Sequence, residues 1–320
     1  MSRERVSLDF QQEGSSRPKN PGAEKMLGVV MPVLNHGFVY LVDYMGNDQS
    51  IVQAARVSYG AGTKATSDDR GLIRYLMRNR HTTPFEMAEL KFHIKLPYFV
   101  AAQMVRHRTA NINAESARYS IFKDEFYIPE PLAVSAQSKD NKQGRGEVLP
   151  SDVAQEVRDK LEEHSLNAFE LYHYLLNVDE QGIILDEDRI GVAKELARIP
   201  LPESTYTQWY WKMDLHNLFH FLGLRKDPHA QFEIRQYADA ISEIVKEAFP
   251  HAYKAFEDFQ LNAKIITGPE IEIMAGLFQE KGFKISEDDV LRIADQAGLK
   301  NKRERNEMVE KFKKMGVISE

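Results

Sequence analysis

The sequence predicts an α+β fold, with a mixed β-sheet flanked by long helices and a small helical C-terminal appendage. Two observations lead to this class. Candidate strands and helices are interspersed along the chain without the repeating βαβ rhythm that a parallel sheet requires. The chain also has 320 residues, of which 42% are hydrophobic, so it can build one large core and still carry an appendage.

Three regions of the chain differ in character. Residues 1–25 are polar and have no apolar face at helix or strand spacing, which predicts a mobile N-terminal arm. Residues 26–261 contain the strong helix and strand patterns and form the predicted main domain. Residues 262–320 contain three short helical patterns separated by glycines and no motif with recognisable chemistry, which predicts a helical extension of unknown role.

Strands are predicted where β-branched and aromatic residues gather, or where apolar and polar residues alternate. The alternation is strict over residues 90–96, with leucine, phenylalanine and isoleucine on one face and lysine and histidine on the other. The predicted strands cover residues 38–42, 90–96 and 204–211, and residues 119–128 are a further candidate to return to the sheet.

Helices are predicted from apolar stripes, N-caps and prolines. Asp48 and Asp214 are suited to cap the helices that follow them. Pro97 can begin a helix, whereas Pro200 and Pro250 can end or kink one. The expected helices span residues 48–58, 67–76, 98–106, 151–176, 186–198, 214–225, 232–249, 269–280, 286–297 and 302–314. Residues 81–86 are expected to form a polar turn, with a helix end followed by an N-cap as the alternative. Residues 135–150 are expected to form a polar surface loop.

Composition narrows the classes of function. The net charge of −6 argues against a general nucleic-acid binder, which usually carries a positive excess over a whole face. The chain has 0 cysteines, which excludes disulfides, thiolate metal sites and every mechanism that attacks a substrate with a thiol. The sequence contains no apolar run of about 18 residues, so no membrane span is predicted. The first residues lack the apolar block of a secretory signal, so the cytoplasm is the expected location.

A polar and basic segment, residues 106–119, is the strongest candidate for a site. It has no hydrophobic period and contains Arg106, His107, Arg108 and Arg118. Basic side chains this close repel one another and gain little from packing, so they indicate an anionic ligand such as a phosphate. A solvated basic loop has the same composition and stays an alternative. Further groups suited to phosphate or to a carbonyl-rich heterocycle lie near element ends, at Gln103, Arg198 and Arg225.

A metal site is not predicted. His216 and His220 are four residues apart and share a helix face, but the HExxH arrangement that would make such a pair specific is missing. Together with His229, they leave a metal-dependent phosphohydrolase open as an alternative function.

The motifs together resemble those of the flavin-dependent thymidylate synthases, whose signature has the form RHRxxSxNExSxRY. Residues 106–119 match it at Arg106-His107-Arg108, Asn113, Ser116 and Arg118-Tyr119. Further matches follow in the family's order over about residues 37–259, at Ala55-Arg56-Val57-Ser58, residues 81–86, residues 195–198, residues 221–225 and His229-Ala230-Gln231. A flavin mechanism needs no cysteine to attack the pyrimidine, which agrees with the composition.

The resemblance implies a homotetrameric methyltransferase that makes thymidylate from deoxyuridine monophosphate (dUMP) in sites between subunits. It implies FAD as the cofactor, with NADPH as the reductant and 5,10-methylenetetrahydrofolate as the carbon donor. No nucleic acid or membrane is expected as a partner.

The resemblance also implies roles for individual residues. Those expected to contact the nucleotide are Gln103, Arg106, Ser116, Arg118, Arg198 and Arg225. The last four of these are expected to take part in catalysis, with Arg225 favouring ionisation of the uracil ring. Those expected to contact the flavin are Ser58, His81, Thr83, Glu86, Arg106, His107, Arg108 and His220.

The chain departs from the family pattern at several positions. Asn111 stands where many members have serine, and an amide can still donate and accept hydrogen bonds. Ala114 replaces the usual glutamate, and Glu115 follows one position later, where an extended chain points its side chain to the opposite side. Asp214 and His220 stand where asparagine is common. The loss at Ala114 leaves open a non-catalytic regulator that binds nucleotide or flavin.

Overall fold

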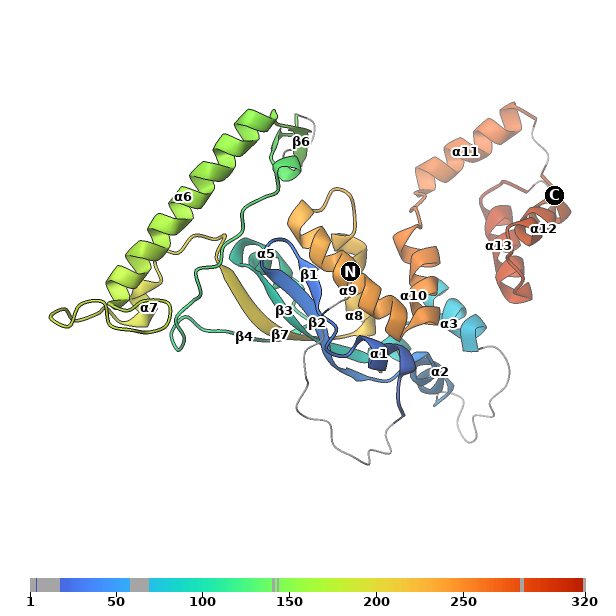
Figure 1. Ribbon diagram of the computed structural model, residues 1–320. Helices are drawn as coiled ribbons and strands as arrows, with labels where there is room; N and C mark the ends of the chain where they lie inside the picture. Colours follow the sequence, from blue (N-terminus) through green and yellow to red (C-terminus); the bar gives the residue numbers. More distant parts are fainter. Residues whose placement is uncertain are drawn as a thin grey trace. The chain divides into compact units, whose positions relative to one another are not determined.

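The computed structural model describes residue 4 and residues 18–57, 69–139, 142, 144–282 and 285–318 (Figure 1). The chain divides into two compact units: unit 1 comprises Met1–Lys64 and Thr82–Tyr253, and unit 2 comprises Ala65–His81 and Lys254–Glu320. The predicted α+β class is confirmed. The extension expected at residues 262–320 falls within unit 2, which also takes in a helix from earlier in the chain.

Five strands form the sheet of unit 1. Their spatial order is β1 (Met31–Val33), β2 (Gly37–Met45), β3 (Glu89–Pro97), β7 (Tyr206–Asp214) and β4 (Asn111–Ala114). The three predicted strands are confirmed as β2, β3 and β7. The four pairs of neighbouring strands are all antiparallel. A mixed sheet was expected, but the parallel pairing in the described part of this sheet is one isolated bridge, between Leu27 and Leu41.

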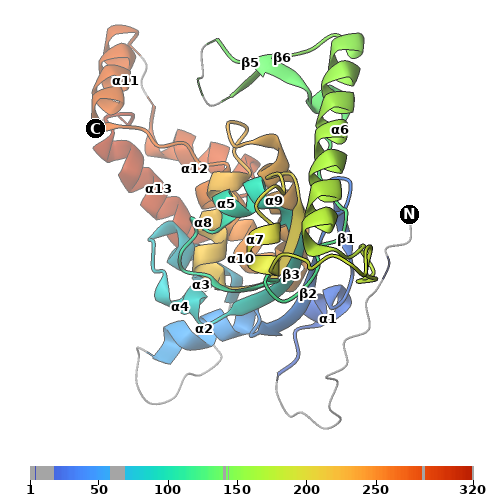
Figure 2. The same cartoon turned by 90° about the vertical axis from the view of Figure 1, so that its left-hand side faces the viewer.

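One face of the sheet forms the main core. The register of β3 and β7 places apolar side chains opposite one another, and all are at most 5% exposed: Leu90, Phe92, Ile94, Trp209, Trp211 and Met213. The helices that pack against the sheet include α5 (Tyr98–Met104), α8 (Leu215–Arg225) and α9 (Phe232–Ala248) (Figures 1 and 2). Burying each large apolar side chain stabilises the fold by roughly 1.5–3 kcal/mol, which is why the strict alternation of β3 predicts its buried face.

The remaining short helices of unit 1 are α1 (Pro21–Met26), α2 (Asp48–Val57), α4 (Thr83–Glu86), α7 (Lys194–Ala197) and the 3-10 turn η1 (Pro131–Ala133). The long helix α6 (Ser151–Leu176), predicted in full, stands beside the sheet (Figures 1 and 2). Its Phe169 and Tyr172 join a second core with Ala117, Phe122 and Ala197. This core holds the end of the basic segment against α6 and α7.

Two aspartates that were expected to cap helices behave differently. Asp214 accepts a hydrogen bond from Asn217 N at 2.9 Å and caps α8, as predicted. Asp48 instead accepts from the backbone N–H groups of His251 and Ala252, at 2.9 and 3.0 Å. It therefore caps α10 (Pro250–Phe256), not its own helix α2.

Four further predictions need correction. The polar turn expected at residues 81–86 is helical over α4. The arm expected over residues 1–25 was wrong for its last six residues, because Asn20 is 2% exposed, caps α1 and donates to Ala248 O at 2.8 Å. Residues 135–150 carry a hairpin of β5 (Ser135–Gln137) and β6 (Arg145–Val148). Residues 119–128 do not join the sheet, and their described pairing is one isolated bridge, from Phe126 to Thr205.

The helix predicted at residues 186–198 was also wrong, since only its last part is helical, as α7. The preceding residues fold back over the C-terminal end of α6. Asn177 donates to the carbonyl oxygens of Asp186 and Arg189 at 2.7 and 2.6 Å. Gly191 lies so close that a Cβ there would be 2.1 Å from Leu176 O. These tertiary contacts satisfy the backbone in place of a helix.

Unit 2 is helical. It contains α3 (Asp69–Arg78), the π-helical turn η2 (Glu257–Leu261), α11 (Gly268–Glu280), α12 (Glu287–Gln296) and α13 (Lys302–Lys314). The three helices predicted after residue 262 are confirmed, with N-caps at Thr267, Ser286 and Asn301. Val290, Val309 and Ile318 form a small core. Among the residues that the structure describes, no helix is long and apolar enough to cross a membrane.

Candidate functional site

His107, in the middle of the Arg106–Arg108 triplet, is turned into unit 1. It lies in the loop after α5 and is 8% exposed. Its Nε2 accepts a hydrogen bond from Arg225 Nε at 3.0 Å, at the C-terminal end of α8. Its ring also meets the Phe221 ring edge-on, with 4.9 Å between centres. Two motifs that are far apart in the sequence therefore meet at this pair.

Burial and positive neighbours keep His107 neutral. Desolvation, together with the charges of Arg225 and His220, lowers its pKa from 6.5 to about 4. A neutral ring that accepts at Nε2 carries its proton on Nδ1. Burial also lowers the pKa of the Arg225 guanidinium. Within the described chain the two terminal amino groups of Arg225 make no hydrogen bond, so they are left to donate to a ligand.

Arg106 and Arg108, on either side of His107, are exposed. Neither forms an ion pair with any carboxylate among the residues that the structure describes. In a chain with a net charge of −6, two such arginines leave a local positive charge. This pair suits an anionic group such as a phosphate.

Gln103, on α5, is oriented by a chain of hydrogen bonds. Its Nε2 donates to Gln231 Oε1, and Gln231 Nε2 donates to Glu233 Oε2 at 2.9 Å. Glu233 is 1% exposed and also accepts from Tyr127 OH at 3.0 Å and from Arg145. Burial opposes its ionisation, but the hydrogen bonds from Arg145 and Gln231 hold the pKa of Glu233 below its usual value. Because the Glu233 carboxylate only accepts hydrogen bonds, it fixes the amide orientations of Gln231 and then of Gln103. This orientation leaves the carbonyl oxygen of Gln103 for a ligand.

Arg118 and Arg198 come together at Glu195. Arg118 Nη2 lies 3.4 Å from Glu195 Oε2, and Arg198 Nε donates to the carbonyl oxygen of Glu195 at 3.3 Å. Ser116 Oγ accepts from Arg118 N at 3.3 Å. A pocket of about 450 Å³ opens here, lined by Tyr98, Phe122, Glu195, Arg198 and Leu201 among others. An exposed ion pair contributes only about 0–1 kcal/mol, so an anionic ligand can replace Glu195 at little cost.

Comparison with known proteins identifies the family. The family model described as thymidylate synthase complementing protein matches residues 40–251. The chain is 50% identical over 294 residues to a flavin-dependent thymidylate synthase of Rickettsia prowazekii, covering 92% of this chain and 97% of that protein. The chain belongs to the flavin-dependent thymidylate synthase family.

Other relatives agree with this family. A flavin-dependent thymidylate synthase of Ruegeria pomeroyi is 56% identical over 247 residues, which is 77% of this chain and 79% of that protein. The crystal structure of a UMP/dUMP methylase, PolB from Streptomyces cacaoi, bound with 5-Br UMP, has a TM-score of 0.62 and 34% identity, and covers 72% of this chain and 98% of that chain.

The candidate flavin residues of this family member lie on several elements. Thr83 and Glu86 lie on α4, which packs against α8. His220, on α8, has its ring centre 6.2 Å from that of His107. His81 belongs to unit 2, at the end of α3. Ser58 lies outside the described residues. The structure thus brings Thr83, Glu86, His107 and His220 around α8.

The departure at Ala114 has a defined geometry. Ala114 ends β4 and lies opposite Trp209 of β7, and the pairing continues because Glu115 N donates to Gln208 O at 2.8 Å. The chain is therefore extended at both positions, and the two side chains point to opposite sides. Tyr98, which lines the pocket, has a raised pKa, mainly because it is buried, and the nearby Glu115 adds to this rise.

Sequence reasoning missed the residues that hold the candidate groups in place. Gln231 and Glu195 belonged to matched motifs but were given no role of their own, and Glu233 and Arg145 were in no matched motif. A polar residue beside the apolar stripe of α9 was the available indication for Glu233. No group of three or more histidine, cysteine, aspartate or glutamate residues in the described chain is placed to hold a metal, and His229 Nδ1 instead lies 2.8 Å from Asp227 Oδ1.

Proposed function

We propose that this chain converts dUMP to thymidylate by reductive methylation, using bound FAD, NADPH as the reductant and 5,10-methylenetetrahydrofolate as the carbon donor. Family membership supports this activity. The observation that carries it is the pairing of neutral His107 with Arg225. This pairing turns a guanidinium toward a ligand in a chain that has 0 cysteines with which to attack a pyrimidine.

The nucleotide is bound by arginines from two separate segments of the chain. Arg118 and Arg198, beside the 450 Å³ pocket, bind its phosphate in place of Glu195, and Ser116 supplies a hydroxyl. Gln103 offers its carbonyl oxygen, because Gln231 already accepts from its amide group. Each of these groups is a proposed substrate contact.

Arg225 polarises the uracil ring. Its guanidinium is held at Nε by His107 and donates through its terminal groups, which stabilises negative charge that develops on the ring. A preoriented donor of this kind costs no reorganisation during the reaction. His107 is thus a positioning residue for Arg225 as well as a candidate flavin contact.

The residues present fit a flavin dinucleotide. FAD, when bound and reduced by NADPH, would supply the hydride that methylation of the pyrimidine requires. Arg106 and Arg108 would hold its phosphates, since both are exposed and have no carboxylate partner in the described chain. Thr83, Glu86, His81, His220 and Ser58 complete the proposed flavin contacts.

We propose a homotetramer in which the sites lie between subunits. β4 supports this, because it is an edge strand with all four residues exposed and lies within the basic segment, between Arg108 and Arg118. An exposed edge strand offers unpaired backbone groups with which another chain can pair. A cytoplasmic location and the lack of nucleic-acid partners stay predictions.

The absorption spectrum of the purified chain tests the cofactor. We expect flavin absorption, and FAD as the molecule released on denaturation. A chain without flavin that holds a tightly bound divalent metal would instead support the phosphohydrolase. A chain that binds FAD and dUMP but forms no thymidylate in the presence of both co-substrates would support the regulator.

A further inference from the structure

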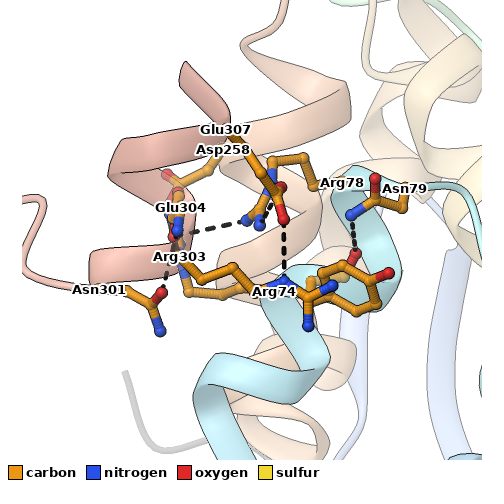
Figure 3. A network of polar contacts seen from close by, with 9 residues as sticks. Arg74, Arg78, Asn79, Asp258, Asn301, Arg303, Glu304 and Glu307 are labelled. Atoms are coloured by element: carbon orange, nitrogen blue, oxygen red, sulfur yellow. Dashed lines mark hydrogen bonds and ion pairs between the residues drawn. The ribbon is translucent and has the colours of Figure 1, made fainter. Parts of the chain in front are cut away.

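The C-terminal helix α13 is joined to α3 by ion pairs within unit 2 (Figure 3). Arg74, on α3, donates through Nε and Nη2 to the two carboxylate oxygens of Glu304 at 3.0 and 2.7 Å, and through Nη1 to Asp258 at 2.5 Å. The side chains of Arg74 and Glu304 are 14% and 7% exposed. A paired, buried arginine–carboxylate contact fixes orientation as well as distance. These bonds therefore set how α13 lies on α3.

A second set of contacts reaches the last turn of α3. Arg78 donates to Glu307 Oε2 through Nε and Nη2, at 2.8 and 2.6 Å, and Arg303 donates to Glu307 Oε1 at 3.0 Å (Figure 3). The Arg303 guanidinium lies 3.8 Å from the ring centre of Tyr75, within the range of a cation–π contact. A residue of α13 therefore contacts Tyr75 and orients its ring.

The end of α3 in turn holds His81. Arg80 N donates to Met77 O at 3.2 Å, and His81 N donates to Leu76 O at 2.9 Å, with Arg80 at φ 56°. This pair of bonds is a Schellman motif, which fixes the two residues after a helix. The His81 ring also lies against Tyr75, with 5.7 Å between ring centres. Tyr75 therefore contacts both Arg303 and His81.

We propose that α13 is a positioning element for His81, acting through Arg303 and Tyr75, so that the C-terminal extension controls how tightly the chain binds FAD. This inference rests on the proposed function, in which His81 contacts the flavin. A ligand binds more tightly when the side chain that meets it is already ordered. Without the contact from α13, the Tyr75 and His81 rings become ordered only when the flavin binds, and this ordering weakens the binding.

The test is FAD titration of the full-length chain, followed by flavin fluorescence. Arg303→Ala should raise the Kd for FAD about two- to fivefold, the range expected for loss of an exposed cation–π contact. Arg303→Lys, which keeps a positive charge near Tyr75, should recover most of the affinity. Arg292→Ala is the matched control, because Arg292 is an exposed arginine of unit 2 that pairs with Asp289, three residues before it, at 3.1 Å. The control should bind FAD like the wild type.

A double-mutant cycle separates positioning from general loss of structure. If Arg303 acts through His81, Arg303→Ala should have little further effect on the Kd in a His81→Ala background. If Arg303→Ala changes the Kd for FAD equally in both backgrounds, or binds FAD like the wild type, this inference is wrong and the proposed function stands. A wild-type chain that does not bind FAD would overturn the proposed function, and this inference with it.

Discussion

Acid should destabilise the folded chain through His107. The pKa of this histidine falls from 6.5 to about 4 on folding. Below pH 6.5 the unfolded chain takes up a proton at this position and the folded chain does not, so the stabilisation present above pH 6.5 is lost as the pH falls toward 4. The loss is roughly 2 kcal/mol at pH 5 and about 3 kcal/mol at pH 4.

The variant His107→Gln isolates this effect from other titrating groups. Glutamine does not titrate, and its carbonyl oxygen can accept from Arg225 Nε as His107 does. Urea unfolding followed by tryptophan fluorescence is a suitable assay, because Trp211 is fully buried and lies 5.1 Å from Phe221, which packs on His107.

We expect the free energy of unfolding of the wild type, relative to His107→Gln, to fall by roughly 2 kcal/mol between pH 7 and pH 5. A difference that stays constant over this range would refute the neutral state of His107. It would also remove the reason for assigning His107 to the positioning of Arg225.

Three further predictions concern the nucleotide site and the scaffold. Arg118→Ala should abolish thymidylate formation with FAD still bound, and near-normal turnover would exclude Arg118 from the substrate site. Ala114→Glu should tighten dUMP binding about tenfold in isothermal titration, through a charge-assisted hydrogen bond, whereas unchanged or weaker binding would count against a weakened site. Gly191→Ala should lower the free energy of unfolding by roughly 1–3 kcal/mol, because its Cβ would meet Leu176 O at 2.1 Å. Gly276→Ala, on α11, should leave the free energy of unfolding unchanged or raise it, because a Cβ there has nothing within 4 Å. Equal changes in the free energy of unfolding at the two glycines would contradict this explanation.

The parts of the fold that depend on local pattern were predictable from the sequence. β3 alternates strictly because one face is buried, and α8 begins where Asp214 caps it. Asp48 shows the limit of such reasoning, because its carboxylate caps a helix 203 residues later, at His251. The failed helix at residues 186–198 has the same origin, since Asn177 satisfies backbone carbonyls that a helix would have used.

The candidate site divides in a similar way. Motif order identified residues such as Arg118, Arg198 and Arg225, and the structure gives each a contact. The turning of His107 toward Arg225 was not predictable, because a loop residue has no period that indicates which way it faces. Glu233 is the clearest example of a site residue that the sequence could not predict. A carboxylate at the start of an amphipathic helix usually faces solvent, and only the partners from other elements allow this one to be buried.

The central claim is that the chain carries out the full methylation of dUMP. The most direct test measures tritium release from dUMP labelled at the carbon that receives the methyl group. With FAD, NADPH and 5,10-methylenetetrahydrofolate all present, we predict tritium release together with formation of thymidylate, and neither when the folate is omitted. A chain that binds FAD and dUMP but releases no tritium under these conditions would contradict the account.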